Sequence, residues 1–391
     1  MNPENYENTE FGSVSITPGE KNAFHFYLPK PVPRTISYSG ELVSELSRAS
    51  SSLGNLRGLS ALISDPAVLI GPYIKREALA SSRIEGTQAS LSEVLKSEVS
   101  GEEASDDIKE VQRYLDATYA AFKLSEKLPI TQRLFLEVHR VLMEGVRGEE
   151  KQPGVLRTSP VWIGAAGDTP STAPFVPPLP EYLGDLLTDW EKFVNDDGQT
   201  LPPVIQAALM HYQFETIHPF LDGNGRIGRL LINLLLKERN ELEYPLLYLS
   251  HFFETHRADY YDALQRVREK GDMENWLKFF CRAVSEQADD AVIRARRLVD
   301  LIESYRAQAA NVRSNLPRLI DIISVNPFVT VRSVADALDV SEQGARNILR
   351  TAASSDFGWI ESIGTFGRGG REHWVAMEFL SIMEGPMAYL E

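Results

Sequence analysis

One stretch, HPFLDGNGRIGR from His218 to Arg229, combines an imidazole, a carboxylate, an amide, three glycines and two guanidinium groups. An imidazole titrates near neutral pH, so His218 could take a proton from a hydroxyl group. Asp222 is an oxygen ligand suited to Mg²⁺, which usually keeps one or two protein carboxylates beside substrate phosphates. Gly223 and Gly225 permit unusual backbone conformations and let main-chain N–H groups approach an anion. The stretch therefore predicts a phosphate-handling site.

The apolar residues that follow place this stretch at the start of a helix. Their helical spacing predicts that the helix begins near Asn224 or Gly225, so its free amides and dipole would face the same anion. Arg226 and Arg229 lie three residues apart on one helix face, where both could reach a polyphosphate. The alternative is that His218 only caps the preceding helix, but this combination of groups has no shared structural purpose. The apolar positions are Leu230, Ile232, Leu234, Leu235 and Leu236.

The whole stretch resembles the signature of the Fic family, whose members mostly transfer AMP from ATP to a hydroxyl side chain of a target protein. The resemblance implies that His218 is the general base and that Asp222 holds Mg²⁺ against the α- and β-phosphates. It also implies that Asn224 steadies the α-phosphate, Arg226 binds the phosphates and Arg229 grips the γ-phosphate. Phe220 would point into the core. The implied nucleotide-binding residues of the loop are Asp222, Gly223, Asn224, Gly225, Arg226, Gly228 and Arg229.

A second segment, residues 154–178, interrupts the helical pattern with β-like alternation at Val161 and Ile163 and with glycine and proline turns. It predicts a β-hairpin, with an ordinary surface loop as the alternative. In Fic proteins a hairpin here is a flap that lies over the active site and aligns the target by main-chain pairing. The residues that resemble the flap begin with Gly154 and Arg157, and the target-docking part comprises Val161, Trp162, Ile163 and Gly164.

Two adjacent tyrosines, Tyr260 and Tyr261, resemble a family pair near the adenine of the nucleotide. Adjacent tyrosines on a helix are otherwise commonly half core and half surface. Both are therefore expected to contribute to nucleotide binding, on the resemblance alone.

Upstream, the segment KREALASSRIEGTQ contains Ser81 and Glu85 four residues apart, followed by Gly86. Gly86 indicates the end of a helix, and Ser81 and Glu85 would share one helix face. By themselves these residues favour a solvated helix end, because such short strings often arise by chance. Before a Fic core they resemble the family's inhibitory motif, which implies that Glu85 pairs with Arg229 and removes the guanidinium that would bind the γ-phosphate.

Composition limits the classes of function. The 391 residues contain 40 Lys and Arg against 55 Asp and Glu, and the net charge of −15 argues against non-specific nucleic-acid binding by the whole chain. The single cysteine, Cys281, lies in an apolar helical stretch and is interpreted as core packing. No segment resembles a signal peptide or is apolar enough to span a bilayer, so we expect a cytoplasmic protein without a membrane partner.

The periodicity predicts a mainly α protein with a Fic-type helical core, a β-hairpin flap and a small C-terminal winged helix-turn-helix domain. Expected helices of the core are 108–128, 131–146, 180–195, 202–216, 224–237, 254–270 and 275–313, after a helical region from Ser39 to Ser100. The expected divisions are 1–35, a mobile tail and extended strap; 36–105, an N-terminal region with the inhibitory helix; 106–313, the catalytic core; and 314–391, the winged-helix domain.

In the last division, three short helices precede two strands around the glycine-rich tip FGRGGRE. Arg346 and Arg350 would lie on the outward face of the third helix, and Arg368 and Arg371 on the wing. Residues 315–391 nevertheless carry six basic and ten acidic side chains, so DNA binding is not favoured over a protein contact or dimerisation.

The leading hypothesis is an autoinhibited protein adenylyltransferase, which uses ATP and Mg²⁺ to place AMP on a Ser, Thr or Tyr hydroxyl of a target protein or of itself. One rival is a DNA-binding regulator whose pocket only senses a nucleotide. The complete set of base, carboxylate, amide and arginine favours catalysis, because a sensor needs no base. Removal of AMP, another nucleotide donor and a homodimer stay open.

Overall fold

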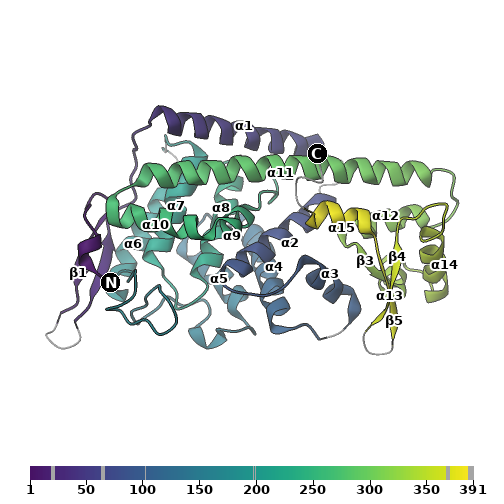
Figure 1. Cartoon of the computed structure of the whole chain (residues 1–391), viewed down its shortest axis with the longest axis horizontal. Helices are drawn as coiled ribbons and strands as arrows, with labels where there is room; N and C mark the ends of the chain where they lie inside the picture. The colour runs from purple at the N-terminus through teal and green to yellow at the C-terminus, as the bar shows by residue number, and fades with distance from the viewer. Residues whose placement is uncertain are drawn as a thin grey trace.

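The computed structural model describes residues 1–18, 23–62, 67–101, 103–196, 198, 200–366 and 370–385. These residues form a mainly helical molecule in which one long helix, α11, runs along the body toward a small C-terminal module, with α1 beside it (Figure 1). None of the described helices is both long and apolar enough to cross a membrane. The body contains α1 (Gly40–Leu62), α2 (Ala67–Ile84), α3 (Leu91–Ser100), α4 (Asp106–Ser125), α5 (Gln132–Met143), α6 (Leu183–Val194), α7 (Pro203–Ile217), α8 (Asn224–Glu238), α9 (Leu249–Thr255), α10 (Arg257–Lys270) and α11 (Met273–Gln308).

Helix α7 is the centre of the body. Every residue from Val204 to Ile217 is buried, so this helix is covered on all sides and must carry its polar side chains into the interior. Six residues separate the end of α7 from the start of α8, and the residues of α8 from Arg226 to Leu236 are all buried as well. The loop between α7 and α8 therefore joins two fixed helices, which limits how far its side chains can move.

A single helix was expected over 254–270, and this was wrong at its start. Two separate helices, α9 and α10, meet at His256. His256 has non-helical dihedrals, φ −113° and ψ 39°. The Thr255 hydroxyl and the His256 ring both bond to the carbonyl of Phe252. Such side-chain bonds compete with the main-chain ladder of a helix.

The N-terminal segment differs from the expected mobile tail. Strands β1 (Gly12–Ile16) and β2 (His25–Pro29) pair antiparallel, and residues 19–22 between them lie outside the described residues. Phe26 and Tyr27 of β2 are buried in a small apolar cluster with Phe175 and Val176. The polar composition of the first residues hid β1, whose two apolar residues, Val14 and Ile16, are only part of a five-residue strand.

The segment 154–178 folds back on itself but is not the expected hairpin ladder. One antiparallel bridge, Ile163 with Phe175, is present among the described residues. The next hydrogen-bonded pair on one side would need the missing N–H of Pro177. On the other side Ala165 donates instead to Asp168, with an N–O distance of 2.6 Å. A turn and a proline therefore stop the ladder after one pair.

The C-terminal module contains α12 (Leu316–Val325), α13 (Val331–Leu338), α14 (Glu342–Ala352), α15 (Met377–Glu384) and a three-stranded sheet with the order β3-β5-β4. The strands are β3 (Phe328–Thr330), β4 (Glu361–Phe366) and β5 (Arg371–Val375). The three helices and the β4–β5 pair follow the expected order, whereas β3 and α15 were not expected. Arg368, expected at the tip of the wing, lies outside the described residues.

This module is attached to α2 and α3. Arg76 of α2 donates to the carbonyl of Met383 in α15, with an N–O distance of 2.9 Å. Asn326 donates to the carbonyl of Leu95 in α3 at the same distance. Because α2 and α3 flank Glu85, the module contacts both helices around the expected inhibitory residue.

Candidate active site

His218 lies at the end of α7 in a left-handed conformation, with φ 52° and ψ 63°. Its Nδ1 lies 3.3 Å from the carbonyl oxygen of Glu215. A carbonyl can only accept, so Nδ1 carries the proton and Nε2 keeps its lone pair. Burial, together with the nearby Arg157 guanidinium, lowers the pKa of His218 to about 3. The imidazole is therefore neutral at physiological pH and able to accept a proton at Nε2.

Arg157, from the segment after α5, holds the backbone on both sides of His218. Its buried guanidinium donates to the carbonyl oxygens of His218 at 2.7 Å and Ile217 at 3.2 Å. A third bond reaches the carbonyl of Pro178, and the Arg157 main-chain N–H donates to that of Pro219. Burial lowers the pKa of Arg157 to about 10, so the group stays charged at neutral pH.

His139, on α5, is a residue of the site that the sequence analysis missed. Its ring is stacked on Phe220 with a centroid distance of 3.7 Å. Nδ1 accepts the N–H of Gly154, and Nε2 therefore donates to the carbonyl oxygen of Asp222 at 3.0 Å. The pair fixes one neutral tautomer, and burial lowers the pKa of His139 to about 4. The apolar spacing of α5 gave no sign that one buried position is polar.

Asn224 and Phe220 shape the loop from inside. The Asn224 side chain accepts the N–H of Phe220 at 2.8 Å and donates to its carbonyl oxygen at 2.9 Å. Both polar ends of the amide are thus used by the loop itself. The Asn224 side chain therefore helps to hold the shape of the loop, and its expected contact with a phosphate stays a prediction. Phe220 is buried, as expected.

Arg226 and Asp222 lie side by side at the start of α8. The Arg226 guanidinium is buried, and its Nε and Nη1 have no hydrogen-bond partner among the described residues. Asp222 is more open, with 45% of its side chain exposed, and its Oδ1 lies 3.5 Å from Nη2 of Arg226. Buried donors without partners carry a large desolvation cost, so the arrangement suits an anion that supplies acceptors.

The described residues contain no group of three or more His, Cys, Asp or Glu that could hold a metal ion by themselves. A single carboxylate, Asp222, next to a phosphate-binding position fits Mg²⁺, which usually keeps several waters and takes its other ligands from substrate phosphates. The residues present are therefore compatible with a nucleotide-dependent Mg²⁺ site.

Arg229 of α8 bonds to Ser81, in the last turns of α2, and to Glu85, which follows the end of that helix. The Arg229 guanidinium is buried and donates to the hydroxyl of Ser81 at 2.9 Å, to the carbonyl of Ser81 at 2.9 Å and to Glu85 Oε1 at 2.7 Å. Burial opposes ionisation of Glu85, but Arg229 holds the pKa of that carboxyl below its usual range. Helix α2 ends at Ile84 and Gly86 has φ 105°, as the sequence predicted.

Three positions of the loop have room only for glycine, because atoms of other residues lie where a Cβ would be. Gly223 has φ 77°, and a Cβ there would lie 3.0 Å from the sulfur of Met143. A Cβ on Gly225 would overlap the Glu85 carboxylate, and one on Gly228 would overlap the Glu215 carboxylate. The Glu85 carboxylate thus lies at the N-terminal end of α8, which is the position that attracts an anion.

The tyrosine pair is divided between core and surface. Tyr260 is buried, its hydroxyl lies 2.8 Å from Nε2 of His211, and its ring is stacked on Phe253. Tyr261 is 41% exposed and lies beside Arg257. The charges of Arg229 and Glu85 act on both tyrosines. Only Tyr261 therefore has a surface that a base could contact from solvent.

The residues expected to dock a target lie on the segment that Arg157 anchors. Trp162 is 43% exposed and Val161 is partly buried. Ile163 directs its main-chain N–H and carbonyl inward to Phe175. In an antiparallel pair the neighbouring residues then direct theirs outward, so Trp162 and Gly164 present main-chain groups on the outer side.

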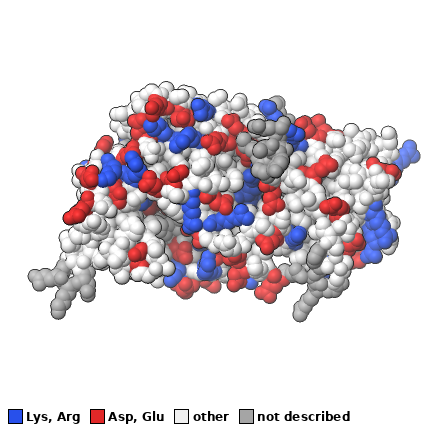
Figure 2. All heavy atoms as spheres, in the orientation of Figure 1, with Lys and Arg blue, Asp and Glu red and all other residues white. Residues whose placement is uncertain are grey.

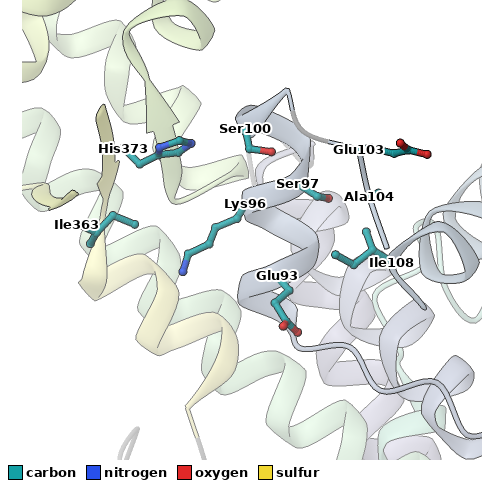
Figure 3. A pocket seen from close by; sticks show the side chains of 9 residues that line it. All are labelled: Glu93, Lys96, Ser97, Ser100, Glu103, Ala104, Ile108, Ile363 and His373. Atoms are coloured by element: carbon teal, nitrogen blue, oxygen red, sulfur yellow. The ribbon is translucent and has the colours of Figure 1, made fainter. Parts of the chain in front are cut away.

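A cavity of about 250 Å³ lies elsewhere, between α3, the start of α4 and the C-terminal sheet, and shares no residue with the loop (Figure 3). Lys96 and Ser97 line it from α3, and Ile363 and His373 from the sheet (Figure 3). Over the whole visible face, acidic and basic side chains are mixed (Figure 2). Neither feature adds a group to the site around His218.

Sequence comparison and structure comparison both find Fic proteins. A family profile described as Fic/DOC family N-terminal matches residues 43–123, and one described as Fic/DOC family matches residues 129–236. The protein adenylyltransferase Fic of Drosophila melanogaster is 33% identical over 172 residues, which are 44% of this chain and 31% of that protein. The chain thus spans about a third of the length of the curated relatives it matches.

Two solved structures share the fold. A Fic family protein from Desulfovibrio desulfuricans G20 aligns with a TM-score of 0.57 and 21% identity, over 88% of this chain and 98% of that one. Fic-1 from C. elegans aligns with a TM-score of 0.50 and 24% identity, over 66% of this chain and 74% of that one. At these identities the likeness establishes the fold and nothing finer.

Proposed function

The chain belongs to the Fic/DOC family through residues 43–123 and 129–236, and from that premise we propose that it is an autoinhibited protein adenylyltransferase. It would transfer AMP from ATP to a hydroxyl of a target protein or of itself and release pyrophosphate. The observation that carries this proposal is the meeting, at the N-terminus of α8, of a neutral imidazole, an open carboxylate and a buried arginine with two nitrogens that have no hydrogen-bond partner among the described residues.

In the proposed reaction, His218 takes the proton of the acceptor hydroxyl at Nε2 while that oxygen bonds to the α-phosphorus. The bond from the α-phosphorus to the bridging oxygen breaks, and pyrophosphate leaves. Arg226, Arg229 and the α8 amides would hold the phosphates, since positioning and charge neutralisation supply most of the catalysis of such transfers. Mg²⁺, held by Asp222, would add charge neutralisation at the phosphates.

The contact between Glu85 and Arg229 supports the autoinhibited state. Arg229 cannot use the same N–H groups for Glu85 and for a γ-phosphate, and a second anion beside the Glu85 carboxylate would be repelled. ATP would therefore bind with its terminal phosphate displaced unless Glu85 moves. Ser81 would keep Arg229 in place in both states, because it bonds to Nε and Nη2 of the guanidinium.

The outward main-chain groups of Trp162 and Gly164 support a docking role for residues 161–164. An extended target segment could pair with this edge and so bring its hydroxyl toward His218. Trp162, which is exposed, would then contact a side chain of the target.

The test is to incubate Glu85→Gly protein and wild type with labelled ATP and a cell extract, and to identify modified residues by mass spectrometry. The proposal expects a mass increase of one AMP on hydroxyl side chains, stronger in the variant. A UMP-sized adduct from UTP, with no adduct from ATP, would show that the nucleotide donor is UTP and not ATP. Absence of any adduct in both proteins would refute the transferase.

A further inference from the structure

A buried carboxylate that the proposed reaction does not use lies next to its base. Glu215 is in the last turn of α7, three residues before His218, and is 7% exposed. Its Oε2 lies 4.0 Å from Nδ1 of His218. Its Oε1 has no hydrogen-bond partner among the described residues and lies against Gly228. A buried carboxylate oxygen without a partner costs free energy, so its presence calls for an explanation.

Charged groups from three other segments of the chain act on the Glu215 carboxyl group. Arg229 faces it from α8, Glu85 from the segment after α2, and Arg268 from α10. Tyr260 of α10 also interacts with it, and His218 lies on its own helix. Burial raises the pKa of Glu215 to about 7, and Glu85 adds to that effect. The group therefore changes charge in the physiological range.

His218 lies among cations. Arg157 and Arg268 disfavour its protonated form, and Glu85 is the carboxylate that favours it. In the proposed reaction Glu85 has to leave Arg229 before ATP binds productively. The imidazolium formed during transfer would then lose the support of Glu85 and remain beside two guanidinium groups. A further carboxylate near Nδ1 would offset the repulsion between the imidazolium and these guanidinium groups.

Resting on the proposed function, we propose that Glu215 is a positioning residue for His218. As a carboxylate it accepts the Nδ1–H once Nε2 has taken the hydroxyl proton, and so stabilises the imidazolium. The proton remains on His218, and Glu215 only accepts a hydrogen bond. In the present structure the main-chain carbonyl oxygen of Glu215 accepts the Nδ1–H instead, at an N–O distance of 3.3 Å, which is long for a hydrogen bond. A rotation of the side chain would bring the carboxylate from 4.0 Å into range.

The kinetic test uses the full chain with Glu85→Gly as parent, and adds Glu215→Gln, Glu215→Asp or Glu137→Gln. The last is a matched control, because Glu137 is an exposed carboxylate of α5 paired with Arg140. Glu215→Gln should lower kcat roughly tenfold, leave the KM for ATP unchanged, and remove the rise of kcat with pH, which lies at lower pH in this background because Glu85 no longer raises the pKa of Glu215. Glu215→Asp should keep that rise with a smaller loss of kcat.

An unchanged kcat and pH profile in Glu215→Gln would overturn the proposal. So would an equal effect on kcat and on the KM for ATP with the pH profile retained, because that pattern indicates a role in placing phosphates through Arg229. Thermal unfolding of each variant separates these outcomes from a loss of folded protein, and Glu215→Asp keeps the test valid if Glu215→Gln fails to fold.

A second readout does not depend on transfer. In histidine-labelled wild-type protein without ATP, the ring signals of His218 should shift in a step near pH 7, as Glu215 ionises, and this step should be missing when Glu215→Gln is made in the wild-type chain. A step that persists in Glu215→Gln, or that is absent in wild type, would refute the inference. If the Glu85→Gly parent transfers no AMP at all, the proposed function fails while this titration still decides on Glu215.

Discussion

The loop from His218 to Arg229 and the outer face of α14 both carry arginines, but they use them in opposite ways. In the loop, Arg226 and Arg229 are almost completely buried and are surrounded by side chains from α2, α5 and α7. On α14, Arg346 and Arg350 are exposed, and Figure 2 shows basic side chains on the part of the surface where α14 lies.

The difference concerns preorganisation. A buried arginine has already lost its water and most of its freedom, so an arriving anion gains strong interactions at little further cost. An exposed arginine keeps both, and a contact to it is weak and sensitive to salt. The loop is therefore built for chemistry, and α14 offers at most a surface. The predictions below test this contrast, from the largest expected effect to the smallest.

Replacing the base should cause the largest loss. His218→Ala in a Glu85→Gly background should reduce AMP transfer by about a hundredfold or more, because the other two buried imidazoles of this region, His139 and His211, already use Nε2 in hydrogen bonds. The measurement is incorporation of labelled AMP. Transfer at the parent rate in a folded His218→Ala protein would contradict the assignment of the base.

Removing the Glu85 carboxylate should have the next largest effect. Glu85→Gly should raise self-AMPylation roughly tenfold or more, since it frees the N–H groups of Arg229 for ATP. Glu254→Gln is the matched control, because that carboxylate pairs with Arg83 at 3.6 Å and not with Arg229. Equal activation by both variants would show that general loosening, rather than the Arg229 contact, causes the effect.

Arg157→Lys should lower kcat about tenfold, because an ammonium group cannot bond at the same time to the carbonyls of Ile217, His218 and Pro178. Steady-state rates in the Glu85→Gly background measure this. Arg140→Lys, an exposed arginine of α5, should leave kcat unchanged. If the two substitutions behave alike, the loop does not depend on Arg157.

Acid should destabilise the protein through its buried imidazoles. The pKa values of His139, His211 and His218 are lowered from 6.5 to about 4, 3 and 3 by burial. Between pH 6.5 and 4 the unfolded chain binds more protons than the folded one, so the free energy of unfolding falls as pH decreases. Melting curves at pH 7.5, 6 and 5 should show a falling Tm. A Tm independent of pH in this window would contradict the buried neutral state.

The smallest effect is expected on α14. Arg346→Ala with Arg350→Ala should change AMP transfer by less than about twofold and the free energy of unfolding by less than about 0.5 kcal/mol. Calorimetry and the labelled-AMP assay measure both. A large loss of transfer would abolish the contrast between the two regions and give the exposed arginines a part in the reaction.

Much of the helical body could be predicted from the sequence, because the apolar periodicity of α4, α5, α6 and α8 is regular and their ends carry ordinary turn residues. The pairing of Glu85 with Arg229 was likewise expected, through a resemblance and not through spacing, since 144 residues separate the partners. The β1–β2 pair was missed because polar residues surround Val14 and Ile16 of β1, so only an extended strap was expected within residues 1–35. The ladder expected at 154–178 was wrong because Pro177 and the Asp168 turn stop it after one bridge.

The polar interior of the site could not be predicted at all. His139 and Glu215 stand at ordinary positions of helical patterns, and nothing in their neighbours along the chain shows that both are buried. Their importance comes from residues far away in sequence, Asp222 and Gly154 for His139 and Gly228 for Glu215. Only the packing of α5, α7 and α8 brings these groups together.

Under the proposed function, Gly225 limits how this protein can lose its inhibition. The space above its Cα holds the Glu85 carboxylate, and under the proposed function a phosphate would need the same α8 terminus. A side chain at position 225 would obstruct inhibitor and substrate alike, so no substitution there can yield an enzyme that is permanently active. Variants that escape control must instead arise on the other partner, in α2 or the segment after it. Spontaneous activating mutations should therefore gather around residues 81–86 and leave the loop untouched.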